Sequence, residues 1–286
     1  MVDISVLIPV FDSEMLAAQV LAVTSQITAF TWELVVIDRE ASATATQVVD
    51  RLMASDSRVR RISLPGRHGS TQLRNIGVRS TVGSSIVFCG VDEVVGDGWL
   101  DAMAAALAKT PLVAGRLDYR RLNEADVWRG PDQPQARNLE VLFGYAVVTG
   151  AIGVHRDLWE SLRGVDERFG AFGADLDFTI RAQRHLGIKP KLAIDAICHH
   201  RQRTGMVVTW LRCAHEGSAS VRLYDRYGRG RVDRSAERRR ARQDWWWIVT
   251  RSPLLVNRHR RSKWMRTAGL RSGRLFGSVR ERTFYP

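Results

Sequence analysis

The sequence predicts an α/β fold, a mixed and mostly parallel sheet flanked by helices, with a basic helical C-terminal extension. Short, nearly continuous apolar runs recur along residues 1–200, as expected for strands covered on both faces, and helical patterns separate them. Strands and helices in this order favour parallel pairing with right-handed crossovers. An antiparallel α+β arrangement would need hairpin signals, which this region lacks.

The elements follow from these runs in chain order. The first run, residues 4–10, is closed by Pro9, and Ser13 offers an N-cap to the helix that follows. The second run ends on Asp38, and a Pro-Gly pair closes the third. The expected strands are residues 4–10, 33–37, 59–64, 86–89, 112–117, 146–154 and 191–198. The expected helices are residues 14–23, 41–53, 69–81, 99–109, 157–162, 175–187 and 206–227.

The fourth strand is the one around which the chain is organised. Its apolar run ends abruptly at two adjacent carboxylates, Asp92 and Glu93, and a helix opens at Trp99. In open α/β sheets, ligands bind outside the carboxyl ends of the strands, where these acids would lie. The sequence therefore predicts a ligand site at this edge.

The charge of the chain is concentrated at one end. Residues 1–200 carry 21 basic and 24 acidic side chains, a net of −3, and residues 201–286 carry 22 and 6, a net of +16, which together give +13. Three cysteines without metal spacing suit a reducing compartment. We find neither a signal peptide nor an apolar run of about 18 residues, so we expect a cytoplasmic protein.

Seven short motifs carry a resemblance. They are Ile4-Ser-Val-Leu-Ile-Pro-Val-Phe11, Glu33-Leu-Val-Val-Ile-Asp38, Leu73-Arg74-Asn75, Val87-Phe88 to Asp92 with Gly98-Trp99-Leu100, Gly164-Val-Asp-Glu-Arg-Phe-Gly170, Gly173-Ala-Asp175-Leu-Asp177 and His199-His200. In this order they resemble a family 2 glycosyltransferase of the Rossmann-like GT-A fold, over roughly residues 3–215. The resemblance implies a GT-A domain at 1–228, with a nucleotide-binding half (1–100) and an acceptor and catalytic half (101–228), and an Arg- and Trp-rich extension at 229–286.

The resemblance implies a site for a nucleotide sugar, with a UDP-sugar favoured. Asp38 would accept a hydrogen bond from the base, and Arg74 would bind the base or a phosphate, for which its fork of donors is suited. Without the ordered motifs, the favoured interpretation of Asp38 would be a helix cap and that of Arg74 a surface ion pair. The remaining residues expected at the donor are Pro9, Val10, Phe11, Val91 and Asp92.

A divalent cation, Mg²⁺ or Mn²⁺, is also implied. The family's Asp-x-Asp motif is here Gly90-Val91-Asp92, so the first acid is lost and the second is kept. One carboxylate suffices for Mg²⁺ when phosphates supply other ligands. His199 or His200, after the last strand, matches the third metal or phosphate contact, although a lone histidine is usually structural.

The catalytic base implied by the resemblance is the acid of a Glu-Asp pair, which is here Ala174-Asp175. Asp175 is the first choice for deprotonating the acceptor and Asp177 the second. A helix N-cap would explain either acid by itself. The missing acids at Gly90 and Ala174 keep open an alternative, a non-catalytic GT-A-fold protein that binds a glycan or a partner enzyme.

The implied reaction is an inverting single displacement, of hexosyltransferase type, onto a glycan or lipid-linked acceptor in cell-wall or polysaccharide synthesis. Residues 120–140, a polar loop, and the segment 169–172 would form the acceptor walls.

The basic tail has three readings. Arginines interspersed with Trp245, Trp246, Trp247 and Trp264 are typical of a protein at an anionic membrane surface, here the inner face of the cell membrane. Nucleic acid is the less favoured ligand, because no recognised nucleic-acid-binding motif accompanies the charge. The third reading is a solvated extension packed on the catalytic domain.

Overall fold

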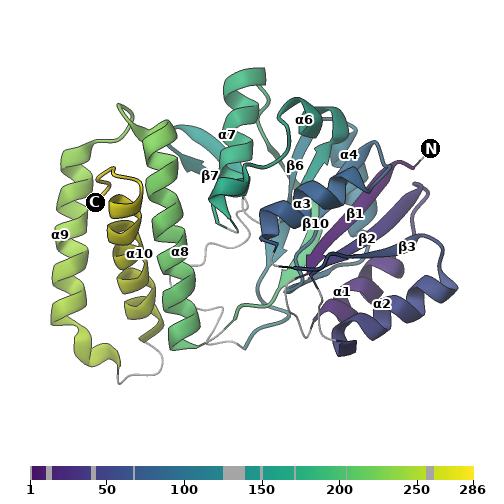
Figure 1. Cartoon of the computed structure of the whole chain (residues 1–286), viewed down its shortest axis with the longest axis horizontal. Coiled ribbons are helices and arrows are strands. Elements are labelled where there is room, and N and C mark those ends of the chain that lie inside the picture. Colours follow the sequence, from purple (N-terminus) through teal and green to yellow (C-terminus); the bar gives the residue numbers. More distant parts are fainter. Residues whose placement is uncertain are drawn as a thin grey trace. The chain divides into compact units, whose positions relative to one another are not determined.

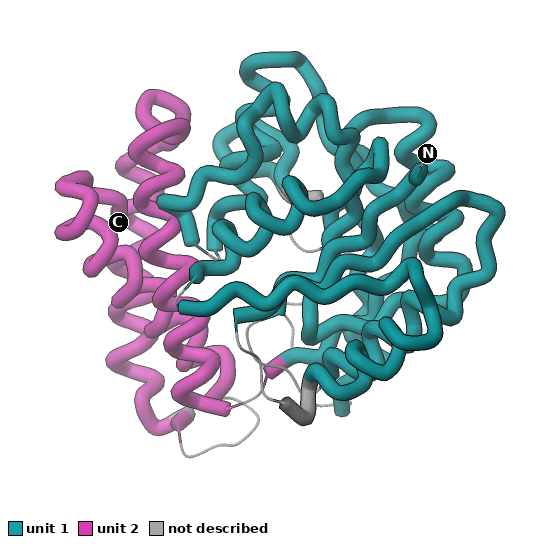
Figure 2. Tube along the Cα trace, turned by 45° about the vertical axis from the view of Figure 1, so that its right-hand side comes forward, with its two compact units in different colours: residues 1–202 teal, residues 203–286 magenta. Residues whose placement is uncertain are grey.

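The computed structural model of the chain describes residues 2–10, 15–39, 43–66, 68–124, 139–148, 151–170, 172–203, 205–255 and 261–286. Its contacts divide the chain into two compact units, residues 1–202 and 203–286 (Figure 2). The sequence placed the boundary between residues 228 and 229. The structure divides the chain earlier because helix α8 (Met206–Leu223) packs along helix α10 (Arg261–Arg280), inside the second unit.

The first unit is built on one large mixed sheet (Figure 1). Strands β9 and β5 run antiparallel to their neighbours, and the other pairings are parallel. In spatial order the strands are β3 (Val59–Ser63), β2 (Trp32–Asp38), β1 (Ile4–Val10), β4 (Ser85–Phe88), β9 (Ile152–His155), β6 (Leu112–Asp118), β10 (Lys191–His200) and β5 (Glu93–Val95). The predicted mixed, mostly parallel fold is confirmed.

One expected strand is in fact two. Residues 146–154 contain β8 (Tyr145–Val148), which pairs with β7 (Leu139–Leu142) in a separate hairpin, and β9, which enters the main sheet. The hairpin turns at Phe143 and Gly144, both with positive φ (53° and 82°), a conformation that suits a tight two-residue hairpin turn. The last residues of the predicted 120–140 loop therefore form a strand.

Alternating side chains on β1 hold helices on both faces of the sheet. Val6, Ile8 and Val10 belong to a core cluster that contains α1 (Leu16–Thr24) and α4 (Trp99–Leu107). Leu7 points to the other face, where a Cβ on Gly77 of α3 (Ser70–Arg79) would lie 2.7 Å from its methyl groups. The glycine thus lets α3 lie close against the sheet. The other helices of the unit are α2 (Ala43–Ser55), α6 (Arg156–Ser161), the short η1 (Glu167–Phe169) and α7 (Ala174–Leu186).

The second unit is a group of helices (Figure 1). Glycines at every fourth position of α10 (Gly269, Gly273 and Gly277) face α8, and a Cβ on Gly273 would lie 2.0 Å from the carbonyl oxygen of Ala214. The absence of side chains there lets the two backbones meet. Between these helices come η2 (Tyr224–Gly228), α9 (Arg234–Thr250) and η3 (Ser252–Leu255). Within the described residues, no helix is both long and apolar enough to span a bilayer.

Candidate active site

The predicted site residues gather at one edge of the sheet because the parallel strands all end there. Pro9 and Val10 close β1 and are buried, Asp38 closes β2, and residues 90–92 follow β4. Asp118 and His200 close β6 and β10 at the same edge. Motifs that are far apart in the sequence therefore lie at the same edge of the sheet. Phe11 lies outside the described residues.

Asp38 is fully buried and already paired. Its Oδ2 accepts a hydrogen bond from Arg61 Nε at 2.7 Å and its Oδ1 one from Ser63 Oγ at 3.1 Å, both on the neighbouring strand β3. Arg61 also bonds Asp50 of α2, at 2.9 Å. The carboxylate is thus held at the end of β2, and a base that reached it would have to displace the half-buried Arg61 side chain or share Asp38 with it.

The missing acid at position 90 has a physical explanation. Glu93 folds back, and its Oε2 accepts a hydrogen bond from the Gly90 N–H at 2.8 Å. A Cβ on Gly90 would lie 3.0 Å from the Glu93 carboxyl carbon and 3.2–3.3 Å from its two oxygens. The carboxyl of Glu93 therefore occupies the space into which a side chain at position 90 would grow. Asp92, beside it, is half-buried.

Glu93 is 5% exposed. Burial opposes its ionisation, but attraction to His200 and hydrogen bonds from Gly90 N–H and Cys198 Sγ–H lower its pKa below the ordinary value. The His200 Nδ1 atom lies 3.6 Å from Glu93 Oε1, which is too far for a hydrogen bond, so the attraction is electrostatic. Within the described structure, this buried nitrogen has no hydrogen-bond partner.

The two histidines differ because neighbouring residues of a strand point to opposite faces. His199 has both ring nitrogens engaged, Nδ1 with Asp118 Oδ2 at 2.7 Å and Nε2 with Arg121 Nη1 at 3.3 Å. This arrangement leaves His200 as the histidine with a ring nitrogen to offer. Burial opposes ionisation of Asp118, yet the contact with His199 and backbone hydrogen bonds lower its pKa.

Arg74 and Asp175 form an ion pair, Nη1 to Oδ1, although 101 residues separate them. Arg74 lies on α3 and Asp175 in the first turn of α7, so the contact joins the two predicted halves of the domain. Both side chains are about one-fifth exposed (21% and 17%). The guanidinium lies 5.3 Å from the ring centre of Phe88, and its Nε is buried without a partner among the described residues.

Asp177 is placed differently. It is fully buried, and its Oδ2 accepts a hydrogen bond from Arg181 Nε at 2.7 Å. Arg181 in turn donates to the carbonyl oxygens of Leu162 and Gly164. This arrangement is typical of a structural acid that fixes α7 against the preceding turn. Ala174, the other departure from the family pattern, is 1% exposed.

Asn75 explains one of the remaining motifs. Its Oδ1 accepts a hydrogen bond from Val165 N and its Nδ2 donates to Val165 O and Glu167 Oε1, at 3.0–3.1 Å. A Cβ on Gly164 would lie 2.4 Å from Asn75 Oδ1, and Gly164 has φ +69°, so a glycine is required twice over. The motif at residues 164–170 thus holds α3 through Asn75, and α3 carries Arg74.

No group of three or more His, Cys, Asp or Glu side chains in the described ranges is arranged to hold a metal ion. The sequence analysis placed Glu93 at the ligand edge without giving it a role, and it missed Asp118 and Arg121. Asp118 ends β6 at the same edge, which is the signal that could have found it. The predicted acceptor walls fall partly outside the described residues, at 125–138 and at Ala171.

Solved structures share this fold at low sequence identity. The mannosyltransferase PcManGT from Pyrobaculum calidifontis, in complex with GDP-Man and Mn²⁺, has 15% identity and a TM-score of 0.63, over 96% of this chain and 86% of that one. TarS 1–349 from S. aureus with UDP-GlcNAc has 14% identity and a TM-score of 0.57 (99% and 93% covered). Glucosyl-3-phosphoglycerate synthase from Mycobacterium tuberculosis, with Mn²⁺, UDP and phosphoglyceric acid, has 18% identity and 0.56 (79% and 78%).

A comparison with curated protein sequences gives no match. The pattern that defines the family "Glycosyl transferase family 2" matches residues 5–157, which is more than half of the chain. The match includes the strand ends at Val10 and Asp38, the segment after β4 with Asp92, and helix α3, which carries Arg74. The chain is a GT-A-fold glycosyltransferase and belongs to glycosyl transferase family 2.

Proposed function

We propose that this glycosyltransferase moves a hexose from a nucleoside-diphosphate donor to an acceptor hydroxyl with inversion, and that Asp175 is the general base. The observation that carries the proposal is the Arg74–Asp175 contact, which joins the nucleotide-binding half to the catalytic half. Asp175 is the partly exposed acid of the first turn of α7, whereas Asp177 is fully buried. A base must reach the proton that it removes, so exposure favours Asp175.

Arg74 has two duties in this proposal. Without donor it pairs with Asp175. A bound diphosphate offers oxygens that suit the guanidinium fork as well as the carboxylate does. Transfer of Arg74 toward the diphosphate would hold the leaving group and release Asp175 to accept the acceptor proton. Donor binding would thereby activate the base.

The residues present fit a divalent cation. His200 turns its buried Nδ1 toward Glu93, so its other ring nitrogen, Nε2, is the one proposed to bind a metal, and Asp92 offers a half-buried carboxylate four residues after β4. In metal sites, a ligating histidine commonly turns its second nitrogen to a carboxylate, which fixes the ring. Asp92 and His200 would hold Mg²⁺ or Mn²⁺, with Glu93 orienting His200. The ion would neutralise charge on the leaving diphosphate.

For the donor we favour a UDP-sugar, with Asp38, Val91 and Asp92 at the nucleoside. Neighbours of the same fold were solved with UDP, UDP-GlcNAc or GDP-Man, so both uridine and guanosine donors belong in the test. The acceptor proposed is a glycan or a lipid-linked intermediate in the cytoplasm, with residues 229–286 at an anionic membrane surface.

The test is release of nucleoside diphosphate from UDP- and GDP-sugars by the full chain, with and without Mn²⁺. The proposal predicts metal-stimulated release from one donor class. Tight binding of a nucleotide without any release under every acceptor condition would instead favour the non-catalytic alternative, a glycan- or partner-binding protein.

A further inference from the structure

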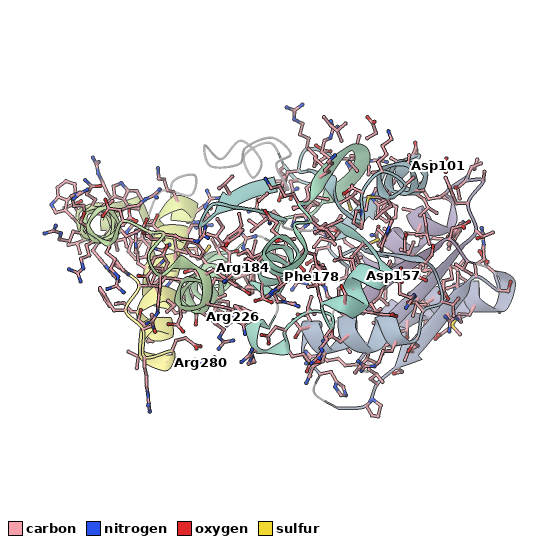
Figure 3. The ribbon with its side chains drawn as sticks, turned by 90° about the horizontal axis from the view of Figure 1, so that it is seen from above. Asp101, Asp157, Phe178, Arg184, Arg226 and Arg280 are labelled. Carbon is pink, nitrogen blue, oxygen red and sulfur yellow. The ribbon has the colours of Figure 1, made fainter. Side chains whose placement is uncertain are left out.

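Residues 203–286 contain a surface hollow of about 270 Å³ that no predicted active-site residue lines. Four arginines line it: Arg229 after η2, Arg234 and Arg238 on α9, and Arg282 after α10. Thr283, Phe284 and Pro286 complete the wall, and no Asp or Glu side chain contributes. The Pro286 main-chain oxygen accepts a hydrogen bond from Arg274 Nη1 at 2.6 Å. We call this space, lined by the four arginine side chains, the arginine hollow. Figure 3 shows the side chains of the surrounding helices, with Arg226 and Arg280 labelled.

The unit has no acid left to neutralise this hollow. It contains six acidic residues, and each is engaged in the described structure. Five form ion pairs, Glu216 with Arg212, Asp225 with Arg229, Glu237 with Arg274, Asp244 with Arg271 and Glu281 with Arg222. The sixth, Asp233, caps the N-terminus of α9 by accepting from the N–H groups of Ser235 and Ala236.

Three of the four guanidinium groups therefore lack an anionic partner. Arg234 donates from Nε to the Tyr224 hydroxyl oxygen at 2.8 Å. The side chains of Arg238 and Arg282 have no hydrogen-bond or ion-pair partner among the residues that the structure describes. Like charges that converge without a counter-charge repel one another, so their placement favours an anionic ligand.

The walls of the hollow are held in place before any ligand arrives. Tyr224 and Tyr285 stack with ring centres 4.3 Å apart and 6° between their planes. Thr283 Oγ1 donates to Asp225 Oδ1 at 2.7 Å and accepts from Arg229 Nη2 at 3.0 Å. These contacts tie the segment after α10 to the turn before α9. The segments from which these arginines project are therefore held in place, and binding costs less entropy than it would if those segments had to be ordered as well.

We propose that the arginine hollow binds a phosphate ester, the group carried by anionic lipid headgroups. Tetrahedral phosphate oxygens match guanidinium forks, which donate two hydrogen bonds at once. A nucleic acid would present a row of phosphates along a groove, whereas these arginines converge on one place. This inference does not depend on sugar transfer.

The helix that carries two of these arginines also favours a lipid source. Arg234, Arg238, Trp245 and Val249 are spaced so that they share one face of α9. Trp245 and Val249 are 37% and 70% exposed, and Phe284 at the hollow is 58% exposed. Trp264, by contrast, is used internally, since its Nε1 donates to the Ile248 carbonyl oxygen at 2.9 Å. Exposed aromatic and apolar side chains beside arginine suit the boundary between headgroups and acyl chains.

The test compares two triple variants of the full chain. The hollow variant carries Arg234→Gln, Arg238→Gln and Arg282→Gln, which spares the Arg229–Asp225 pair. The matched control carries Arg239→Gln, Arg240→Gln and Arg251→Gln, which removes the same charge from exposed positions outside the hollow. The probes are glycerol 3-phosphate, followed by calorimetry, and phosphatidylcholine vesicles with or without phosphatidylglycerol, followed by sedimentation.

The hollow variant should lose binding by at least about tenfold, the effect of about one charge-assisted hydrogen bond, while the control stays near the wild type. Loss for both probes identifies the phosphate ester itself as the ligand, and loss for vesicles alone identifies a headgroup presented by a membrane. Equal loss in both variants, or no binding of either probe by the wild type, would overturn the proposal. If the triple variant has a lowered melting temperature, the single variant Arg238→Gln, which breaks no described contact, replaces it. The proposal requires that this variant also bind the probes more weakly than the wild type.

Discussion

Two buried glutamates at opposite edges of the same sheet show how differently this protein uses acids. Glu33, at the amino edge, is 6% exposed, and Glu93, at the carboxyl edge, is 5% exposed. Glu33 Oε1 accepts hydrogen bonds from Ser5 Oγ at 2.6 Å and Val82 N at 2.7 Å, and its Oε2 pairs with Arg60. Both carboxylate oxygens of Glu33 therefore have partners within the protein itself.

The carboxyl edge is different. Glu93 faces His200, whose buried Nδ1 has no hydrogen-bond partner in the described structure. The buried Nε of Arg74, another predicted site residue, also has no partner there. Buried polar atoms without partners are uncommon in folded proteins and need an explanation. The two glutamates are thus equally buried and differ in their hydrogen-bond partners, and the unpartnered atoms lie at the edge where we propose that the donor binds.

The largest effect is expected for Asp175→Asn. Removal of a general base lowers turnover by about 10²–10⁴-fold, and donor affinity should stay within a few-fold because the amide is nearly isosteric. Asp177→Asn is the matched control two residues away. Because Asp177 is buried against Arg181, that change should lower the melting temperature more than the turnover per folded molecule. The reverse pattern would make Asp177 the base.

The next effect is expected for Glu93→Gln. Loss of a carboxylate that orients a metal-binding histidine typically weakens metal affinity by about 10–100-fold. Calorimetry of Mn²⁺ in the presence of UDP measures this directly, without a turnover assay. Glu33→Gln, the equally buried acid of the other edge, is the control and should bind Mn²⁺ like the wild type. Unchanged Mn²⁺ affinity in Glu93→Gln would remove Glu93 from the site.

The smallest effect on activity and a clear effect on folding are expected for Glu33→Gln. Breaking one buried charge-assisted hydrogen bond costs about 2 kcal/mol of unfolding free energy. Denaturant titration should show this loss, with turnover of the folded enzyme unchanged. A fall in turnover without a loss of stability would contradict the assignment of the amino edge to folding.

The pH dependence of stability has a definite sign. Burial opposes ionisation of Glu33, but hydrogen bonds from Ser5, Val82 and Arg60 lower its pKa below the ordinary value of 4.5. An acid with a lowered folded-state pKa stabilises the fold fully above its unfolded pKa, and the contribution is lost as the pH falls through the folded one. Unfolding free energy should therefore fall below about pH 4.5, and less steeply in Glu33→Gln than in the wild type.

The sequence predicted the sheet and the edge at which its parallel strands end, because buried strands have a strong apolar signal that also shows where each strand ends. It could not predict the Arg74–Asp175 pair, which depends on where α3 and α7 meet in space. Nor could it show that Glu93 fills the space beside Gly90, since that requires the local turn geometry. The glycine repeat at 269, 273 and 277, which lets α10 lie against α8, is visible in the sequence and indicates that α8 packs with the C-terminal helices, within residues 203–286.

The most direct test of the account is calorimetric titration of the full chain with UDP and GDP, each with and without Mn²⁺, in the wild type and in His200→Ala. We predict that one of the two nucleotides binds more tightly with Mn²⁺, and that His200→Ala abolishes the gain from the metal while leaving metal-free binding in place. Absence of binding by both nucleotides, or a metal effect that survives in His200→Ala, would contradict the assignment of the carboxyl edge as a metal-assisted donor site.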